Sequence, residues 1–438
     1  MFHLLVALLA FAVVAGAASP PNVVLIISDD HAWSDYGFMG HAHVRTPNLD
    51  RLAAQSLVFP RGYVPASLCC PSLASIITGR YPHEHRITSN DPAVPADVKP
   101  AAKAKSPQFR EGRRVMNGFM ERAATLPRVL AAQGYLSFQT GKWWQGHFKS
   151  GGFTHGMSLG DEEQGGRHGD LGLKIGREGM QPILDFIAMA QAEKKPFLVW
   201  YAPMLPHQPH TAPERVLEKY KTVAPSLHVA RYWANVEWFD ETCGQLLDFL
   251  DQQGLAENTI VAYVADNGWI QDPAAAKYAP KSKQSPYDGG LRTPIMIRWS
   301  GKITPQRRAA LASSLDLYPT LLTALGVTPA ADLPGVNLLD DATVAARTRL
   351  FGECFTHDAK DLTQSEANLR WRWIIDGKMK LIVPAPQNQP GEKPELYDLA
   401  ADPHEEHDLA ADQPERVSAL TRQLDAWWPG TFPAARNR

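Results

Sequence analysis

The clearest chemical feature of the sequence is Cys69, which stands near the start of the run Ser67–Arg80. Pro71 suits the first turn of a helix, and the residues after it can continue that helix as far as Gly79. Cys69 would then lie at the helix N-terminus, where unpaired N–H groups favour a bound anion and the pKa of a thiol is lowered. The run therefore predicts a nucleophile beside an anion site. A buried cysteine that merely begins a structural helix is the alternative.

Two pairs of polar side chains, Asp29-Asp30 and Asp266-Asn267, each follow an apolar run of the sequence. Their carboxylate and amide oxygens are hard ligands that suit Ca²⁺ or Mg²⁺, and no Cys/His spacing indicates a zinc site. Either pair taken alone could equally cap a helix or form a turn. Taken together, the two pairs are candidate metal ligands.

The elements that must position these residues are apolar runs over 22–27, 135–139, 196–201 and 259–265. Because the runs are largely apolar on both faces, we expect buried parallel strands. Helical patterns lie between them, and the clearest covers 231–253 before Gly254. This alternation predicts an α/β fold with a mainly parallel sheet. In such folds ligands bind beyond the carboxyl ends of the strands, where acids, a lysine and a histidine follow here.

The composition narrows the class of protein. The chain has 438 residues, 44% of them hydrophobic, which is enough for a full core. A net charge of −2 argues against nucleic acid or an acidic membrane as the main partner, so any anion site must be local. The four cysteines do not form a disulfide framework, because Cys69 and Cys70 are adjacent and Cys243 lies in a helical core pattern.

Residues 1–19 have the pattern of a secretory signal peptide, with an apolar run from Leu4 to Val14 and then Ala15-Gly16-Ala17. A buried first helix is the alternative. The run is too short to span a bilayer, and no later segment is apolar enough to do so. We therefore expect a periplasmic or secreted protein without a membrane span.

The rest of the chain divides into two predicted parts. We expect a catalytic domain over 20–345 and a small antiparallel subdomain over 346–438. The patterns that indicate the subdomain are short strands at 350–353, 371–375 and 380–383 and a closing helix at 417–428. Segment 92–120, rich in Pro, Ala, Lys and Arg, is predicted to be an exposed insertion near the site.

The run around Cys69 resembles the sulfatase signature, Cys-x-Pro-Ser-Arg-x-x-x-x-Thr-Gly-Arg, at six of its seven fixed positions. The chain thus resembles the formylglycine-dependent sulfatases of the alkaline-phosphatase-like superfamily. This resemblance implies a large, mainly parallel sheet between helices and a small C-terminal antiparallel sheet. It also implies that a formylglycine-generating enzyme oxidises Cys69 to formylglycine, whose hydrate attacks a sulfate ester.

Further matches surround Cys69. Lys142 follows the family's Gly-Lys-Trp pattern, His207 its Pro-His-x-Pro pattern, and Lys283 its lysine spacing before Gly289-Gly290. The resemblance implies that these three residues assist Cys69 in catalysis, with His207 or Lys283 protonating the leaving alcohol. The metal ligands it implies are Asp29, Asp30, Cys69, Asp266 and Asn267. Calcium is favoured over magnesium, because an all-protein cage with an amide ligand suits the larger ion.

Two positions depart from the family. Leu73 stands where the family has arginine, and Trp144 where it has histidine. Three interpretations stay open: a sulfatase with relocated helpers, a phosphate or phosphonate ester hydrolase, and a non-catalytic protein that binds sulfated glycans. The chain shows no second full ligand set, which disfavours two-zinc chemistry. A sulfated saccharide is the expected substrate. Candidates for helpers or for pocket-lining residues are Arg80, His83, His85, His147 and His210.

Overall fold

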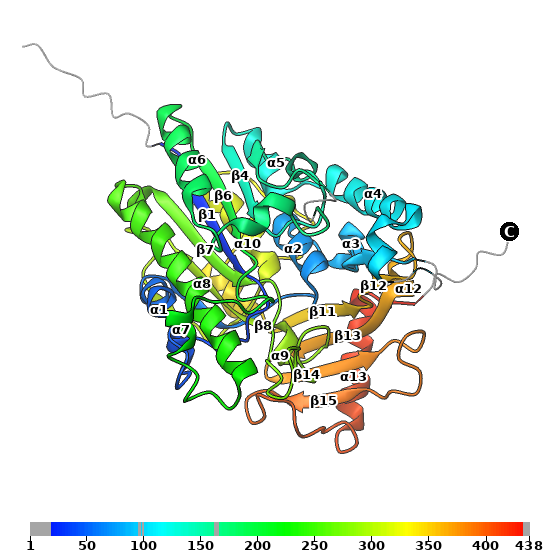
Figure 1. Ribbon diagram of the computed structural model, residues 1–438. Helices are drawn as coiled ribbons and strands as arrows, with labels where there is room; N and C mark the ends of the chain where they lie inside the picture. Colours follow the sequence, from blue (N-terminus) through cyan, green and yellow to red (C-terminus); the bar gives the residue numbers. More distant parts are fainter. Residues whose placement is uncertain (1–18, 95–97, 99, 162–165, 432–438) are drawn as a thin grey trace, which may run out of the picture.

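The structure is a computed structural model that describes residues 19–94, 98, 100–161 and 166–431 (Figure 1). The predicted signal peptide, apart from its last residue, lies outside the described residues. Within the described part of the chain, no helix is both long and apolar enough to cross a bilayer.

A nine-stranded sheet forms the centre of the molecule, in the order β10-β2-β8-β7-β1-β6-β4-β5, with β9 paired to β2. All its pairings are parallel except those of β8, which runs against both of its neighbours. The strands are β1 (Asn22–Ser28), β2 (Leu57–Tyr63), β4 (Leu136–Gly141), β5 (His155–Gly156), β6 (Phe197–Ala202), β7 (Thr259–Ala265), β8 (Arg292–Arg298), β9 (Gln306–Arg307) and β10 (Leu311–Ser313).

The predicted α/β fold with a mainly parallel sheet is confirmed. The four apolar runs form β1, β4, β6 and β7, whose bounds differ from the predicted ones by at most two residues. Strands β2 and β8 were not predicted. Pro60-Arg61-Gly62 interrupts the apolar run of β2, and the register between β2 and β8 shifts between Phe59 and Gly62. This irregular pairing hides the strand pattern.

Helices cover both faces of the sheet because its strands are apolar on both sides (Figure 1). Val23, Leu25 and Ile27 of β1 pack in the same core cluster as α2, α4, α5 and α10, whereas Val24 and Ile26 pack in the cluster of α1, α6 and α8. These helices are α1 (Pro47–Ala54), α2 (Cys69–Thr78), α4 (Pro107–Arg122), α5 (Leu126–Ala131), α6 (Gln181–Ala192), α8 (Leu227–Gln252) and α10 (Leu317–Ala324).

Two predictions were wrong: the start of one helix and the exposure of one segment. Helix α8 begins four residues before position 231, because the Ser226 side chain caps it by accepting a hydrogen bond from the Val229 N–H. Segment 92–120 is not simply an exposed insertion. Its residues 107–120 belong to α4, which buries an apolar stripe that includes Phe109 and Met116. The basic residues that suggested exposure mostly occupy the opposite face of this helix.

The C-terminal part forms a four-stranded antiparallel sheet in the order β11-β13-β14-β15, as expected. Its elements are β11 (Arg349–Phe355), β13 (Leu369–Asp376), β14 (Met379–Pro384), β15 (Glu395–Asp398) and α13 (Pro414–Trp427), whose Leu420 and Leu424 pack on the sheet. The remaining short elements are α3 (Pro82–His85), β3 (Asp91–Pro92), β12 (Asp358–Ala359), α7 (Glu214–Leu217), α9 (Asp288–Leu291), α11 (Asp341–Ala346) and α12 (Ser365–Asn368).

A buried ionic network joins the small sheet to the large one. Lys380 of β14 lies 2.9 Å from an Asp288 carboxylate oxygen and 2.8 Å from one of Glu405. Glu405 in turn accepts a 2.6 Å hydrogen bond from the Asp288 N–H, and the Tyr63 hydroxyl donates to Asp288. Asp288 begins α9, immediately after the loop that carries Lys283. The network therefore fixes one end of that loop.

Replacing the cation of this network should destabilise the fold. We expect Lys380→Met to leave Asp288 and Glu405 buried without their cation, which costs about 3 kcal/mol in the free energy of unfolding. Lys378→Met is the matched control, because Lys378 is 61% exposed in its ion pair with Asp398 and such a pair contributes less than about 1 kcal/mol. Denaturant unfolding measures both. Equal stability of the two variants would contradict a structural role for the network.

Candidate active site

The carboxyl ends of three neighbouring strands meet at the end of β1. Beyond this strand, the Asp29 N–H donates to the carbonyl of Leu205 after β6, at 3.0 Å. The His31 N–H donates to the carbonyl of Asn267 after β7, at 3.1 Å. Asp30 has a φ of 61°, a left-handed conformation that a non-glycine residue adopts only when its surroundings hold it. These bonds place Asp29, Asp30, Asp266 and Asn267 at one edge of the sheet.

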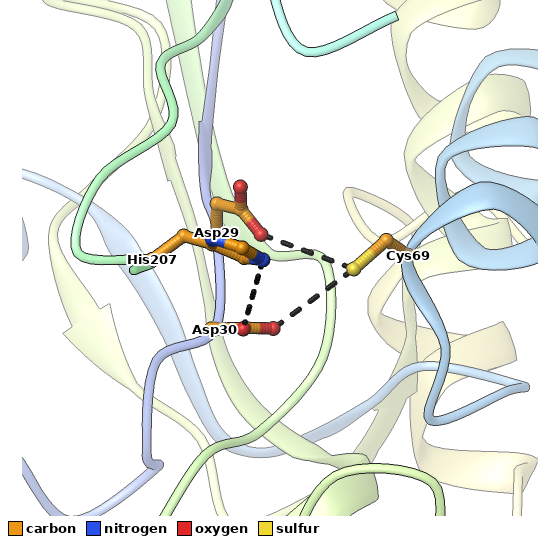
Figure 2. A group of neighbouring side chains, drawn as sticks. All are labelled: Asp29, Asp30, Cys69 and His207. Carbon is orange, nitrogen blue, oxygen red and sulfur yellow. Dashed lines mark hydrogen bonds and ion pairs between the residues drawn. The ribbon is translucent and has the colours of Figure 1, made fainter. Parts of the chain in front are cut away.

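Cys69 faces this edge from the first residue of α2 (Figure 2). Its Sγ lies 4.0 Å from Asp29 Oδ1 and 3.9 Å from Asp30 Oδ1. Lys142, which follows β4, places its Nζ 3.2 Å from Cys69 Sγ and 2.7 Å from Asp29 Oδ1. The helix ends at Gly79 with a φ of 67°, as the sequence predicts. A nucleophile position, two carboxylates and a lysine are thus in contact.

Two further predicted residues complete the cluster. Lys283 Nζ lies 2.7 Å from Asp30 Oδ1. His207 Nε2 lies 3.4 Å from Asp30 Oδ2, as Figure 2 shows. His207 Nδ1 lies 2.6 Å from the carbonyl oxygen of Gln208. Because a carbonyl oxygen can only accept a hydrogen bond, Nδ1 carries a proton and is the donor. The loop of Lys283 is tied to the segment before Cys69 by a 2.9 Å bond from the Gln284 N–H to the Ser67 carbonyl.

Burial and charge set the protonation states of these groups. Burial raises the pKa of Asp30, but the positive charges of Lys283, His207 and Lys142 lower it by more. The pKa of Asp30 is therefore well below its usual value. Burial lowers the pKa of Lys142, but Asp29 and Cys69 raise it above the usual value. Both groups are therefore charged. Burial raises the pKa of the Cys69 thiol, so the expected lowering by the helix N-terminus does not prevail.

The donor atoms of the cluster fit a divalent cation. Asp29 Oδ2, Asp266 Oδ2 and Asn267 Oδ1 are buried and have no hydrogen-bond partner among the described residues. Asn267 Nδ2 donates to Asp30 Oδ1 at 2.7 Å, which leaves its oxygen available. Burying an oxygen without a partner costs free energy of folding. In addition, the carboxylates of Asp29, Asp30 and Asp266 outnumber the two lysines, Lys142 and Lys283. Asp29, Asp30, Asp266 and Asn267 would hold a hard cation that polarises an oxygen of the bound ester.

A cavity of about 270 Å³ opens above this cluster. Its lining contains four of the predicted residues, Cys69, Lys142, His207 and Lys283, and no acidic side chain. Apart from Trp144, the other lining residues were not predicted, because they lie on loops without a strand-end pattern. These residues are Asn90, Trp144, Arg167, His168, Met204, Gln208, Trp269, Lys277, Tyr278, Gln284 and His357.

The proposed helper candidates lie elsewhere. Arg80 and His85 line a separate cavity beside the far end of α2, and His85 Nε2 lies 3.1 Å from Ser75 Oγ. His83 pairs with buried Glu353 at 2.9 Å. None of these three, nor His147 or His210, lines the reaction cavity. Their surroundings favour structural roles for His83 and His85.

The wall around Trp144 carries other basic groups. Leu73 and Trp144 are both buried in the same core cluster. The Arg167 guanidinium lies 4.9 Å from the Trp144 ring centre, and the His168 ring meets its edge at 4.7 Å. Asp91 accepts from Arg167 Nε at 2.7 Å and orients it. Arg167 thus supplies positive charge to the cavity wall beside Trp144, whereas burial keeps the pKa of His168 well below its usual value, so that ring is neutral.

The sequence of this chain matches two protein families. The sulfatase family matches residues 21–327, and the N-sulphoglucosamine sulphohydrolase C-terminal family matches residues 281–427. N-acetylgalactosamine-6-sulfatase of Rattus norvegicus is 30% identical, over 93% of this chain and 85% of that protein. A structure solved with its substrate D-glucosamine-2-N,6-O-disulfate has a TM-score of 0.71 at 18% identity, covering 96% of this chain and 100% of that chain.

The phosphonate monoester hydrolase of Agrobacterium radiobacter also shares the fold, with a TM-score of 0.68 at 19% identity over 93% of this chain and 95% of that chain. The large, mainly parallel sheet between helices and the small antiparallel sheet define the alkaline-phosphatase-like class of fold. Within that class the chain belongs to the sulfatase family, and it is a sulfuric ester hydrolase.

Because buried oxygens of the cluster have no hydrogen-bond partner, we expect divalent cations to stabilise the folded protein. We expect Ca²⁺ added to chelator-treated protein to raise the thermal midpoint by several degrees, since a ligand that binds only the folded state stabilises it. Asp266→Asn should abolish most of that shift because it removes a charged ligand. Asp35→Asn is the control, as Asp35 is a buried acid outside the cluster that accepts from Ser34 Oγ at 2.9 Å. Calorimetric scans that show the same shift in all three proteins would contradict the assigned ligands.

Proposed function

We propose that this protein removes sulfate from a sulfated saccharide in the periplasm or outside the cell. We propose further that residue 69 acts as formylglycine and that Ca²⁺ is the resident ion. The observation that carries the proposal is the single cavity in which Cys69, Lys142, His207 and Lys283 meet above the acidic cluster. An uncharged cavity wall would not hold a sulfate ester, but this one presents lysines on both sides.

Lys142, Lys283 and His207 have different roles in the proposed reaction. Lys142 lies between Cys69 and Asp29, where its charge stabilises an oxygen anion at residue 69 and an oxygen of the sulfate. Lys283 contributes a second positive charge from the opposite loop. His207 Nε2 faces the cluster while its Nδ1–H is held by Gln208. Burial lowers the pKa of His207, whereas Asp29 and Asp30 raise it. Only the imidazolium, which these carboxylates favour, has a proton on Nε2 to deliver to the leaving alcohol.

A saccharide substrate is supported by the relatives and by the cavity. The rat relative and the compared structure with a disulfated glucosamine are named for sulfated sugars. Trp269 and Tyr278 also line the cavity, and aromatic rings with a polar edge suit the mixed surface of a sugar.

A phosphate or phosphonate ester hydrolase with two metal ions is the second candidate. Asp91, His357 and Asp358 form the only other group of possible ligands found among the described residues. Lys103 lies 2.5 Å from Asp358 and 3.3 Å from Asp91, and Arg167 also pairs with Asp91. These cations already neutralise the group, so it does not favour a second metal.

Peptide mass spectrometry over residues 62–80 tests the modification. Conversion of Cys69 to formylglycine should lower the mass of natively produced peptide by about 18 Da. Cys70, the next residue in the same helix turn, serves as the internal control and should remain a thiol. An active enzyme whose Cys69 is wholly unmodified would overturn the formylglycine mechanism.

Paired cysteine variants test the role of residue 69. We expect Cys69→Ala to lower kcat for sulfate esters by at least about 1,000-fold, since it removes the attacking group. Cys70→Ala should retain most activity, because the Cys70 thiol contacts Gln145 rather than the acidic cluster. Steady-state assays with sulfate and phosphate esters, with and without chelator, measure both. Equal activities of the two variants would refute the assignment, and a preference for phosphate esters would favour the second candidate.

A further inference from the structure

A second cavity, of about 450 Å³, adjoins the reaction cavity. Its lining residues are Gln208, Pro209, His210, His228, Arg231 and Ala276. Gln208 lines both cavities. Gln208 Nε2 donates to the carbonyl of Ala276 at 2.7 Å, which joins the loop after β6 to the loop after β7. The two cavities therefore meet at one side chain, one residue after His207.

The second cavity is basic. Three of its six lining side chains are His210, His228 and Arg231, and none is acidic. Arg231 carries positive charge and His228 can carry it, whereas burial lowers the pKa of His210 to about 4, so this ring is neutral. His228 and Arg231 are three residues apart on α8, so they lie on one face of that helix. They also stand in its first turns, where the helix dipole favours an anion.

The basic groups are available to a ligand. Arg231 is exposed and forms no ion pair with a described residue within 4 Å. His210 Nε2 is buried and has no hydrogen-bond partner among the described residues. The His210 ring is fixed between Tyr232, at 5.4 Å, and Trp269, at 6.1 Å. Trp269 lines the reaction cavity, so a side chain of that cavity packs against a lining residue of the second one.

We propose that this second cavity binds another anionic group of the substrate, a carboxylate or a second sulfate, while the scissile sulfate lies over residue 69. The proposal rests on the proposed function. The guanidinium of Arg231 offers paired N–H donors that match the oxygens of either anion. His210 and His228 offer ring nitrogens from the two sides of the cavity. The enzyme would thus prefer sugars that carry at least two anionic groups.

The test compares substrates that differ only in the second anion. A sulfated disaccharide with a free uronate is assayed beside its uronate methyl ester, and N,6-disulfated glucosamine beside glucosamine 6-sulfate. For each pair the measured quantity is the ratio of kcat/KM with the second anion to that without it. We expect a ratio above one, arising in KM, for the uronate pair, the disulfated pair or both. The pair with the larger ratio identifies the anion.

A double variant, Arg231→Gln with His228→Gln, should reduce that ratio by about tenfold, since hydrogen bonds to charged groups are the stronger ones. Lys195→Gln is the charge-matched control, because Lys195 is exposed just before β6, at the opposite end of the sheet. It should leave the ratio unchanged. A ratio of one in the wild type, or a ratio that the double variant does not alter, would overturn the proposal.

The failure of the proposed function is distinguishable from failure of this subsite. If wild-type protein hydrolyses none of these esters nor 4-nitrophenyl sulfate, the proposed function fails. The subsite is then judged by calorimetric binding of the same saccharide pairs. Weaker binding of the double variant to the doubly anionic member alone would support the subsite, and equal binding of both members would refute it.

Discussion

The structure depends on the balance of buried charge at the end of β1. Asp29 and Asp30 are almost fully buried, a position that is unfavourable for two neighbouring carboxylates unless cations compensate them. Lys142 and Lys283 supply part of that compensation from two different loops. The oxygens that remain without partners leave room for a divalent ion. The same arrangement that makes the cluster tolerable in the core makes it a receptor for an anionic ester.

This balance explains why distant segments must be held so firmly. Main-chain hydrogen bonds fasten the end of β1 to the loops after β6 and β7. The buried contacts of Lys380 fasten the loop of Lys283 to the small C-terminal sheet. A loop that moved by a few ångströms would leave a carboxylate buried without its lysine. The small sheet therefore contributes to the site although none of its strands lines the reaction cavity.

Of the two departures from the family, Trp144 lines the reaction cavity, whereas Leu73 packs in the core and is not among the lining residues. Both side chains are apolar and buried in the core, and the charge on that side comes from Arg167, which Asp91 orients. Cys69, Lys142, His207 and Lys283, which match the family patterns, all line the same cavity. Because Trp144 and Arg167 line the cavity beside this cluster, they are placed to affect which esters the cavity accepts.

Much of this architecture could be predicted because the determinants are local. Apolar runs specify β1, β4, β6 and β7, and Pro71 and Gly79 bound the helix of Cys69. The polar residues that follow those strands indicate one edge of the sheet, since parallel strands end together. A composition of basic residues misled the prediction for segment 92–120, because composition averages over the two faces of α4.

The lining of both cavities, in contrast, depends on long-range packing. Arg167 and His168 lie beside Trp144, and Arg231 lines the same cavity as Gln208, although no spacing in the sequence links them. The pKa of Cys69 likewise follows from how deeply the assembled core buries its thiol, which outweighs the local effect of the helix N-terminus. The apolar pattern of a strand and the ends of a helix are determined by residues that are neighbours in the sequence. Burial and charge in a cavity are determined by residues that only folding brings together.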